Sequence, residues 1–412
     1  MKRPPGLKQL IAIAIILISA TCFFVSCNKT DVKIIPGKYD PTGSGIGSTG
    51  ATGSTGGTNP DSTTSTTLFS SPDDVAADAA GNIYVADYGN NMIRKVTPAG
   101  IITTLAGSGN IGAIDATGSL ASFNGPTGVA VDKAGNVYVA DAGNNLIRKI
   151  TSGGVVSTFA GTIAVVDTSN TITTEPTFAG PSGVAVDASG NVYVADAGNN
   201  EIKVVNPAGV VSILAGNGNS GADDGTGSAA TFNNPTGVAV DASGNVYVAD
   251  LLNNLIRKIA PGGIVTTLAG SGLIGSSDGT GALASFYFPN SLAVDATGNV
   301  YVTDDVNNLI RKITPGGVVT TLAGTGLAGS ANGLGTAASF NDPAGITLDI
   351  AGNAYVADAD NNLIRKISPA GLVTTLAGVP PSLGVGRRPI RIYYHIGVNN
   401  KHALPALLRV KR

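Results

Sequence analysis

Carboxylates are the side chains in this 412-residue chain most able to do chemistry, and they recur at two fixed places in a repeated pattern. One set ends a first apolar run and is followed by Gly-Asn: Asp78, Asp132, Asp187, Asp241, Asp295 and Asp349. The other set ends the next run, which mostly reads Tyr-Val-Ala-Asp: Asp87, Asp141, Asp196, Asp250, Asp304 and Asp358. Carboxylates can act as general acids or bases, or bind calcium. Each of these precedes a Gly/Asn turn, so we interpret both sets as turn caps that accept backbone N–H bonds.

The long loops carry further acidic residues at one shared place, Asp115, Asp224 and Asp278, and we assign them the same turn chemistry. Asn170 and Asn332 stand at the corresponding positions and keep the turn chemistry without the charge.

Basic residues also recur, as the pairs Arg94-Lys95, Arg148-Lys149, Arg257-Lys258, Arg311-Lys312 and Arg365-Lys366, with Lys203-Val204 in one copy. Adjacent residues of a strand point to opposite faces, so such a pair cannot form one phosphate clamp. We expect these side chains to cover a solvated blade surface or to pair with a neighbouring blade.

Several catalytic residue types are missing from the repeated region. The two histidines, His395 and His402, follow it, Glu occurs only at Glu175 and Glu201, and Trp is absent. The formal net charge of −2 does not indicate nucleic acid as a partner. The sequence therefore predicts a protein that is not an enzyme and has no cofactor, the alternative being a hydrolase or lyase with an Asp-held calcium in a central channel.

The elements that position these residues repeat every 54 or 55 residues, starting at Pro72, Pro126, Pro181, Pro235, Pro289 and Pro343. Each copy contains four apolar runs of period two, separated by Gly, Asn and Pro turns, as in 128–132, 136–140, 145–150 and 155–159. Four short strands make one antiparallel blade, and blades packed side by side cover each other's faces. The sequence predicts an all-β fold, a six-bladed β-propeller of four-stranded antiparallel blades.

The phase of the repeat indicates how the ring closes. A Phe precedes every opening Pro by three residues, from Phe69 to Phe340, so we expect each blade to be one intact repeat with no strand exchanged between the chain ends. Closure then depends on side-chain packing between blades one and six. The segment 66–68 could still add an edge strand there.

Motifs such as Gly-Val-Ala-Val-Asp-Ala-Ser-Gly-Asn-Val-Tyr-Val-Ala-Asp at 183–196 resemble NHL repeats, and the similarity extends over residues 69–378. The resemblance implies a platform that binds proteins or, in some members, RNA, while a minority of related propellers are enzymes. Fold alone does not choose among these functions.

The ends of the chain differ from the repeats. Residues 1–27 combine a basic start with an apolar run from Leu10 and end at Cys27, which resembles a bacterial lipoprotein signal with Cys27 as the lipidated residue. Ordinary cleavage or an uncleaved anchor are the alternatives. Residues 28–67 form a Gly/Ser/Thr-rich linker, residues 68–378 the propeller, and 379–412 a basic tail without repeats that we expect to be disordered. The alternatives for the tail are that it binds an anionic partner or that it results from an altered reading frame.

We expect the functional residues at positions where the blades differ in sequence. The loop after the second strand and the long loop after the fourth emerge on one face, and long loops favour binding. On that face the residues that depart from the repeat are Tyr88, Leu251, Leu252, Tyr287, Phe288, Asp305 and Val306. We predict a binding surface there, the alternative being that Phe288 and Leu252 pack inward. Taken together, these features predict a binding or scaffold protein that an N-terminal lipid holds in the bacterial cell envelope. Its expected partner is a protein or a glycan.

Overall fold

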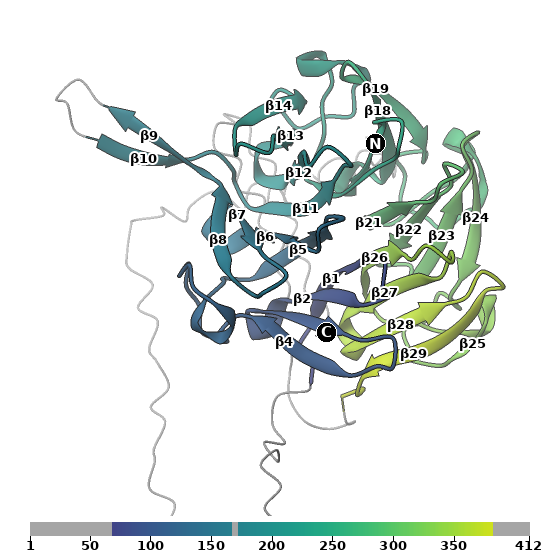
Figure 1. The fold of residues 1–412 in the computed structure, drawn as a ribbon. Helices are drawn as coiled ribbons and strands as arrows, with labels where there is room; N and C mark the ends of the chain where they lie inside the picture. The colour runs from purple at the N-terminus through teal and green to yellow at the C-terminus, as the bar shows by residue number, and fades with distance from the viewer. Residues whose placement is uncertain (1–67, 167–171, 382–412) are drawn as a thin grey trace, which may run out of the picture. The chain divides into compact units, whose positions relative to one another are not determined.

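The computed structural model describes residues 68–166 and 172–381, and these form a ring of six antiparallel blades around a central channel (Figure 1). The fold class predicted from the repeats is confirmed. The signal segment, the whole linker, Asn170 and most of the C-terminal tail lie outside the described residues, so the predictions for them stay predictions.

Every blade is one contiguous stretch of chain with its strands in sequence order from the channel outward. Blade one contains β1 (Pro72–Ala77), β2 (Ile83–Asp87), β3 (Met92–Val96) and β4 (Ile102–Ala106). Blade two contains β5 (Pro126–Val131), β6 (Val137–Asp141), β7 (Leu146–Ile150) and β8 (Val156–Ala160). Blade three contains β11 (Pro181–Val186), β12 (Val192–Asp196), β13 (Glu201–Val205) and β14 (Val211–Ala215). The prediction of intact repeats is thus confirmed.

Blades four to six each gain a fifth, two-residue strand from the preceding loop. Blade four contains β15 (Gly225–Thr226), β16 (Pro235–Val240), β17 (Val246–Asp250), β18 (Leu255–Ala260) and β19 (Ile264–Ala269). Blade five contains β20 (Gly279–Thr280), β21 (Pro289–Val294), β22 (Val300–Asp304), β23 (Leu309–Ile313) and β24 (Val318–Ala323). Blade six contains β25 (Gly333–Leu334), β26 (Pro343–Leu348), β27 (Ala354–Asp358), β28 (Leu363–Ile367) and β29 (Leu372–Gly378).

Connections within a blade are short turns, whereas longer segments join consecutive blades. Between blades two and three the chain forms a separate hairpin, β9 (Thr162–Val166) and β10 (Ile172–Pro176), which projects from the ring (Figure 1). Three-residue 3-10 helices lie in most of the turns after the second strands and in the long loops: η1 (Tyr88–Asn90), η2 (Gly118–Leu120), η3 (Ala142–Asn144), η4 (Ala197–Asn199), η5 (Gly227–Ala229), η6 (Leu251–Asn253), η7 (Gly281–Leu283), η8 (Gly335–Ala337) and η9 (Ala359–Asn361). No helix among the described residues is long and apolar enough to cross a membrane.

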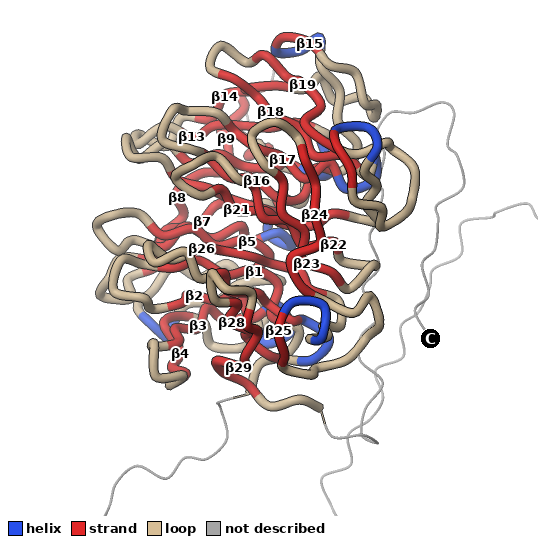
Figure 2. The backbone as a smooth tube through the Cα atoms, turned by 90° about the vertical axis from the view of Figure 1, so that its right-hand side faces the viewer, coloured by secondary structure: helices blue, strands red, loops and turns tan. Residues whose placement is uncertain are grey.

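The apolar core lies between blades rather than within one. Figure 2 shows the strands of the ring turned by 90° from the view of Figure 1. Each cluster joins the outer face of one blade to the inner strands of the next, for example Phe123 and Ile93 against Val129 and Val137. The junction of blades six and one uses the same arrangement, with Phe69 and Val75 against Tyr355 and Ile364. Ring closure by side-chain packing is therefore confirmed.

A repeated hydrogen bond adds to this packing. The second Asn of each Asn-Asn turn takes up the left-handed conformation, with φ near +55° at Asn145 and Asn362. Its side-chain oxygen accepts an N–H from the residue before the Pro of the next blade. At the closing junction Asn362 Oδ1 accepts the Ser71 N–H at 2.9 Å, so the first blade is attached as the others are.

Candidate functional site at the entrance of the central channel

The aspartates that end the first strand are turn caps, as predicted. Asp187 Oδ1 accepts the N–H groups of Ser189 and Asn191 at 2.8 and 2.9 Å, and Oδ2 accepts the Asn191 side-chain amide at 2.8 Å. Partial burial acts to raise the pKa of Asp187, but these hydrogen bonds outweigh it and lower the pKa below its usual range. These carboxylates therefore stabilise the turns that follow the first strands.

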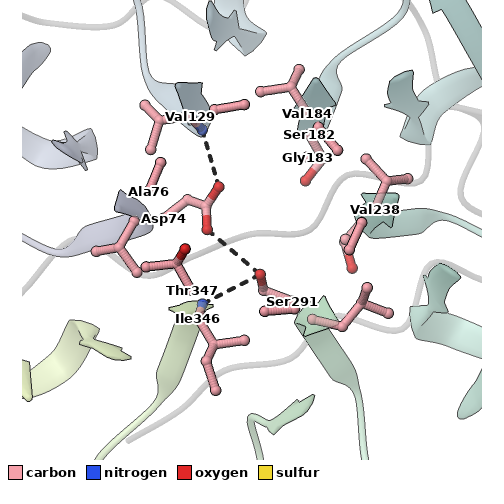
Figure 3. Close-up of a pocket in the computed structure, with 18 of the residues that line it drawn as sticks. Asp74, Ala76, Val129, Ser182, Gly183, Val184, Val238, Ser291, Ile346 and Thr347 are labelled. Carbon is pink, nitrogen blue, oxygen red and sulfur yellow. Dashed lines mark hydrogen bonds between the residues drawn. The ribbon is translucent and has the colours of Figure 1, made fainter. Parts of the chain in front are cut away.

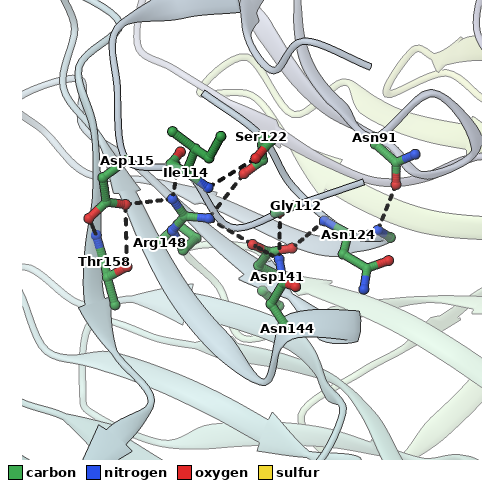
Figure 4. A network of polar contacts seen from close by, with 12 residues as sticks. Asn91, Gly112, Ile114, Asp115, Ser122, Asn124, Asp141, Asn144, Arg148 and Thr158 are labelled. Carbon is green, nitrogen blue, oxygen red and sulfur yellow. Dashed lines mark hydrogen bonds and ion pairs between the residues drawn. The ribbon is translucent and has the colours of Figure 1, made fainter. Parts of the chain in front are cut away.

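The aspartates that end the second strand have a different role from the one predicted. In blade two, Asp141 is fully buried and binds three groups (Figure 4): the Asn124 N–H at 2.7 Å, the Asn144 side chain at 2.8 Å and Arg148 Nη1 at 2.8 Å. Its backbone donor lies 17 residues upstream rather than in its own turn. Asp141 therefore ties the preceding long loop to the blade.

The prediction for the arginines was wrong. Arg148, Arg257, Arg311 and Arg365 are completely buried and pair with the second-strand Asp of their own blade. Arg148 lies over the Phe123 ring at 5.3 Å, because the long loop closes above the third strand and leaves no solvated surface there. Only the Lys of each pair stays near the surface, as Lys149 does above Tyr138.

The loop aspartates are also more than turn caps. Asp115 pairs with Arg148 Nη2 and accepts the Thr158 N–H at 2.9 Å, so it joins the loop to the third and fourth strands (Figure 4). Asp224 and Asp278 pair in the same way with Arg257 and Arg311. Asn332 replaces the carboxylate in blade six and binds Arg365 Nη2 at 2.9 Å. The repeated charged residues thus form ion pairs and hydrogen bonds inside the blades.

The loop-face residues predicted to bind a partner divide into two groups. Leu251, Phe288 and Asp305 are buried, with Leu251 fully inaccessible and Phe288 exposed by 8%. Side chains buried to this extent cannot form a contact surface, which corrects the prediction for these three and agrees with the alternative given for Phe288. Tyr88, Leu252, Tyr287 and Val306 keep exposed surface, and Tyr88 is 38% exposed.

The central channel forms a cavity of about 220 Å³ lined by the six innermost strands (Figure 3). Each of these strands starts with Pro beside the turn that follows the second strand, for example Pro72 opposite Asp87. The two residues after the Pro therefore surround the channel entrance on the loop face. They are polar or Gly in most blades: Asp73-Asp74, Thr127-Gly128, Ser182-Gly183, Thr236-Gly237, Asn290-Ser291 and Ala344-Gly345.

Asp74 and Ser291 stand where the other four blades have Gly, and they meet in the channel (Figure 3). Asp74 Oδ2 accepts the Val129 N–H of blade two at 3.0 Å, and Oδ1 lies 3.5 Å from the Ser291 hydroxyl of blade five. Ser291 Oγ in turn accepts the Ile346 N–H of blade six at 3.4 Å. Two departures from the repeat, 217 residues apart, thus form one polar cluster at the entrance.

Blade five has a further change that supports this cluster. Thr303 replaces the Ala of Tyr-Val-Ala-Asp and is fully buried. Its hydroxyl oxygen accepts the Ser291 N–H at 2.9 Å and donates to the Ala344 carbonyl at 2.8 Å. Thr303 therefore fixes the strand that carries Ser291 against blade six.

Below this entrance the channel wall is apolar. The next ring consists of Val75, Val129, Val184, Val238, Leu292 and Ile346. Burial raises the pKa of Asp74 to about 7, and the neighbouring Asp73 adds to this, while the N–H bonds from Val129 and Val75 oppose it. The entrance thus presents a carboxyl group that changes charge near neutral pH above an apolar wall.

Replacing Asp74 by Asn should change how stability depends on pH. Because the folded pKa of about 7 exceeds the unfolded value of about 3.9, native Asp74 loses stability as pH rises from about 4 to about 7. The free energy of unfolding of Asp74→Asn relative to the native protein should therefore increase over that range, as measured by urea unfolding at several pH values. Asp241→Asn is the control: because the pKa of Asp241 is lowered, its difference from the native protein should stay constant from about pH 4 to about 7 and change, with the opposite sign, only below about pH 4. A difference for Asp74→Asn that stays constant with pH would contradict this assignment.

Comparison with known proteins agrees with the fold. The NHL repeat model matches residues 69–95, 123–150, 178–205, 232–259 and 286–313. The corresponding part of blade six lies outside the matched ranges but keeps the same Asp358–Arg365 pair. Five segments of this six-bladed propeller are therefore similar to the NHL repeat.

Relatives in sequence are larger proteins that share this region. Protein SUPPRESSOR OF QUENCHING 1, chloroplastic, from Arabidopsis thaliana is 29% identical over 189 residues, which are 43% of this chain and 18% of that protein. NHL repeat-containing protein 2 from Gallus gallus is 45% identical over 80 residues, 19% of this chain and 11% of that protein. The chain spans less than a fifth of the length of these relatives.

Solved structures with the same fold come from Bacteroides thetaiotaomicron. A structural genomics protein of unknown function is 21% identical with a TM-score of 0.57, over 73% of this chain and 70% of that one. An auxiliary nutrient binding protein is 16% identical with a TM-score of 0.56, over 75% of this chain and 70% of that one. At these identities the likeness shows the fold.

Proposed function

We propose that this protein is an exported binding protein of the bacterial cell envelope that captures a protein or glycan on its loop face. The channel entrance is the anchoring cavity, and Tyr88, Leu252, Tyr287 and Val306 are contacts on the surrounding face. The observation that carries the proposal is the Asp74–Ser291 cluster. The residues that the blades share form the turns and the buried Asp–Arg pairs. Asp74 and Ser291, by contrast, line the cavity.

The entrance favours a ligand group that donates hydrogen bonds. Asp73 and Asp74 offer carboxylate oxygens, and Thr127, Ser182, Thr236 and Asn290 offer hydroxyl and amide groups around the same opening. Sugar hydroxyls have this chemistry, and so does the ammonium group of a peptide. An apolar wall below a few converging polar groups is typical of small-ligand sites.

Two further observations support a binding role. Five segments of the ring are similar to the NHL repeat, and a protein of the same fold is an auxiliary nutrient binding protein. Among residues 68–166 and 172–381 there is no group of three or more His, Cys, Asp or Glu side chains that could hold a metal ion. The alternative of an Asp-held calcium in the channel predicts that calcium raises the melting temperature and that a chelator lowers it.

The binding proposal is tested with arrays that separate the two ligand sources, one of glycans and one of lysine-containing peptides. The native protein is compared with Ser182→Tyr, which fills the entrance from a partly exposed position. We expect the native protein to bind one class and Ser182→Tyr to lose that signal. Lys133→Ala, in a turn away from the entrance, is the control that keeps it. No signal on either array, or equal signals for native protein and Ser182→Tyr, would contradict the proposal.

Attachment to the envelope by a lipid on Cys27 is tested separately. In bacteria grown with a labelled fatty acid, the native chain should incorporate label and Cys27→Ser should not. Cys22→Ser, which changes the other cysteine of the chain, should remain labelled. Labelled Cys27→Ser, or an unlabelled native chain, would rule out lipidation at this residue without affecting the channel proposal.

A further inference from the structure

The outermost strand of a propeller blade has an unpaired edge, and most blades of this protein cover it. In blade four, Gly225 and Thr226 of β15 pair with Val265 and Ile264 of β19. β20 and β25 cover blades five and six at the same place. In blade two a single antiparallel bridge between Thr117 and Val155 does so. The covering residues come each time from the long loop that precedes the blade.

Blades one and three lack this cover in the part of the chain that the structure describes, and the segment that precedes blade one lies outside that part. The segment that precedes blade three forms the β9–β10 hairpin, which projects from the ring (Figure 1), and no described strand pairs with the outer side of β14. The backbone N–H and C=O groups along that edge remain available to another strand.

The side chains of this edge also differ from the repeat, on both faces of the sheet. Ile213 stands where the other blades have Thr104, Thr158, Thr267, Thr321 and Thr375, and it is 56% exposed. Val204 replaces the Lys that lies over a Tyr in the other five blades, from Lys95 to Lys366. Val210, at the start of the edge, is 60% exposed. Val204 lies on β13, next to the edge strand, so blade three is more apolar at this edge than the other blades.

We propose that a second copy of this chain pairs with this edge, β14 against β14, to form a symmetric dimer. A two-fold axis makes the two strands antiparallel, the same sense in which β15, β20 and β25 cover their blades. Residues 210–214 carry no charge, so two copies meet without like-charge repulsion. Val210 and Ile213 are buried in the contact. The dimer continues the blade-three sheet across both molecules and is independent of the channel proposal.

Sedimentation velocity of the full chain in detergent tests this directly. The native protein should show a monomer–dimer equilibrium that depends on protein concentration. Val210→Lys and Ile213→Lys each place two like charges at the contact and should sediment as monomers with an unchanged melting temperature. Ile264→Lys is the matched control, because Ile264 occupies the Val210 position in the covered blade four, and it should dimerise as the native protein does.

Three results would overturn the dimer. The native chain could remain a monomer at all concentrations, or Ile213→Lys could dimerise as strongly as the native chain. A folded native chain could also stay monomeric while β14 binds a strand of another protein, which protection of residues 210–215 in hydrogen exchange would reveal. Each of these excludes pairing between copies.

Discussion

Replacing Arg257 by Met is expected to lower the free energy of unfolding by about 3–5 kcal/mol. Arg257 and Asp250 are both fully buried, with Nη1 2.9 Å from Oδ2. Removing the guanidinium leaves the Asp250 carboxyl buried without its cation and also frees the Thr231 and Asp223 carbonyls. The loss is measured by urea or thermal unfolding.

Lys258→Met is the control for this experiment, because Lys258 is adjacent in the strand but lies near the surface over Tyr247. Its loss should be within about 1 kcal/mol, as for exposed cation–π contacts. The double variant Asp250→Asn/Arg257→Met should regain part of the stability, since the uncompensated charge is gone. Equal losses for Arg257→Met and Lys258→Met would show that the buried pair does not hold the blade together.

Replacing Gly183 by Val is expected to destabilise the ring by about 1–3 kcal/mol or more, the usual cost of overpacking. A Cβ on Gly183 would lie 2.4 Å from the Thr236 carbonyl oxygen of the next blade, and backbone has little room to move away. The inner strands approach this closely because the channel is narrow at the ring of Gly128, Gly183 and Gly237. Thermal unfolding measures the effect.

Ser182→Val is the matched control, because it introduces the same side chain one residue earlier, at a partly exposed position facing the cavity. Its melting temperature should remain close to the native value. If Gly183→Val were as stable as Ser182→Val, the glycines would not be required for close approach of the blades.

The fold could be predicted almost completely from the sequence, because the signals are local and repeated six times. Alternation of period two and Gly/Asn turns determine the strands, and the 54–55-residue spacing determines the blade count. The caps at Asp187 and its counterparts were predictable for the same reason, since their partners lie two and four residues away.

Interactions over longer distances could not be predicted in this way. Asp141 binds a backbone N–H 17 residues upstream and Arg148 binds Asp115 33 residues upstream, so neither pairing is visible in a turn motif. The loop residues Leu251 and Phe288 depart from the repeat and are buried, which only packing reveals.

The channel cluster was missed for a different reason, although the sequence contains its signal. Comparing the third position of each copy gives Gly in four blades and Asp74 and Ser291 in the other two. The sequence does not show that blades one and five, on either side of blade six, bring these two residues together, because they lie 217 positions apart in the chain. Departures from the repeat on the inner strands, rather than those in the loops, mark the cavity.

The most direct test of the channel as the binding site is the affinity of native protein and Asp74→Ala for the glycan or peptide that the arrays identify. Isothermal titration calorimetry should show about a tenfold or greater loss for Asp74→Ala, since a hydrogen bond to a charged group contributes about 1.5–3 kcal/mol and about 1.4 kcal/mol corresponds to a factor of ten. Asp241→Ala, a turn cap outside the channel, should bind as the native protein does. Equal affinity of native protein and Asp74→Ala would contradict the assignment of the site to the channel entrance.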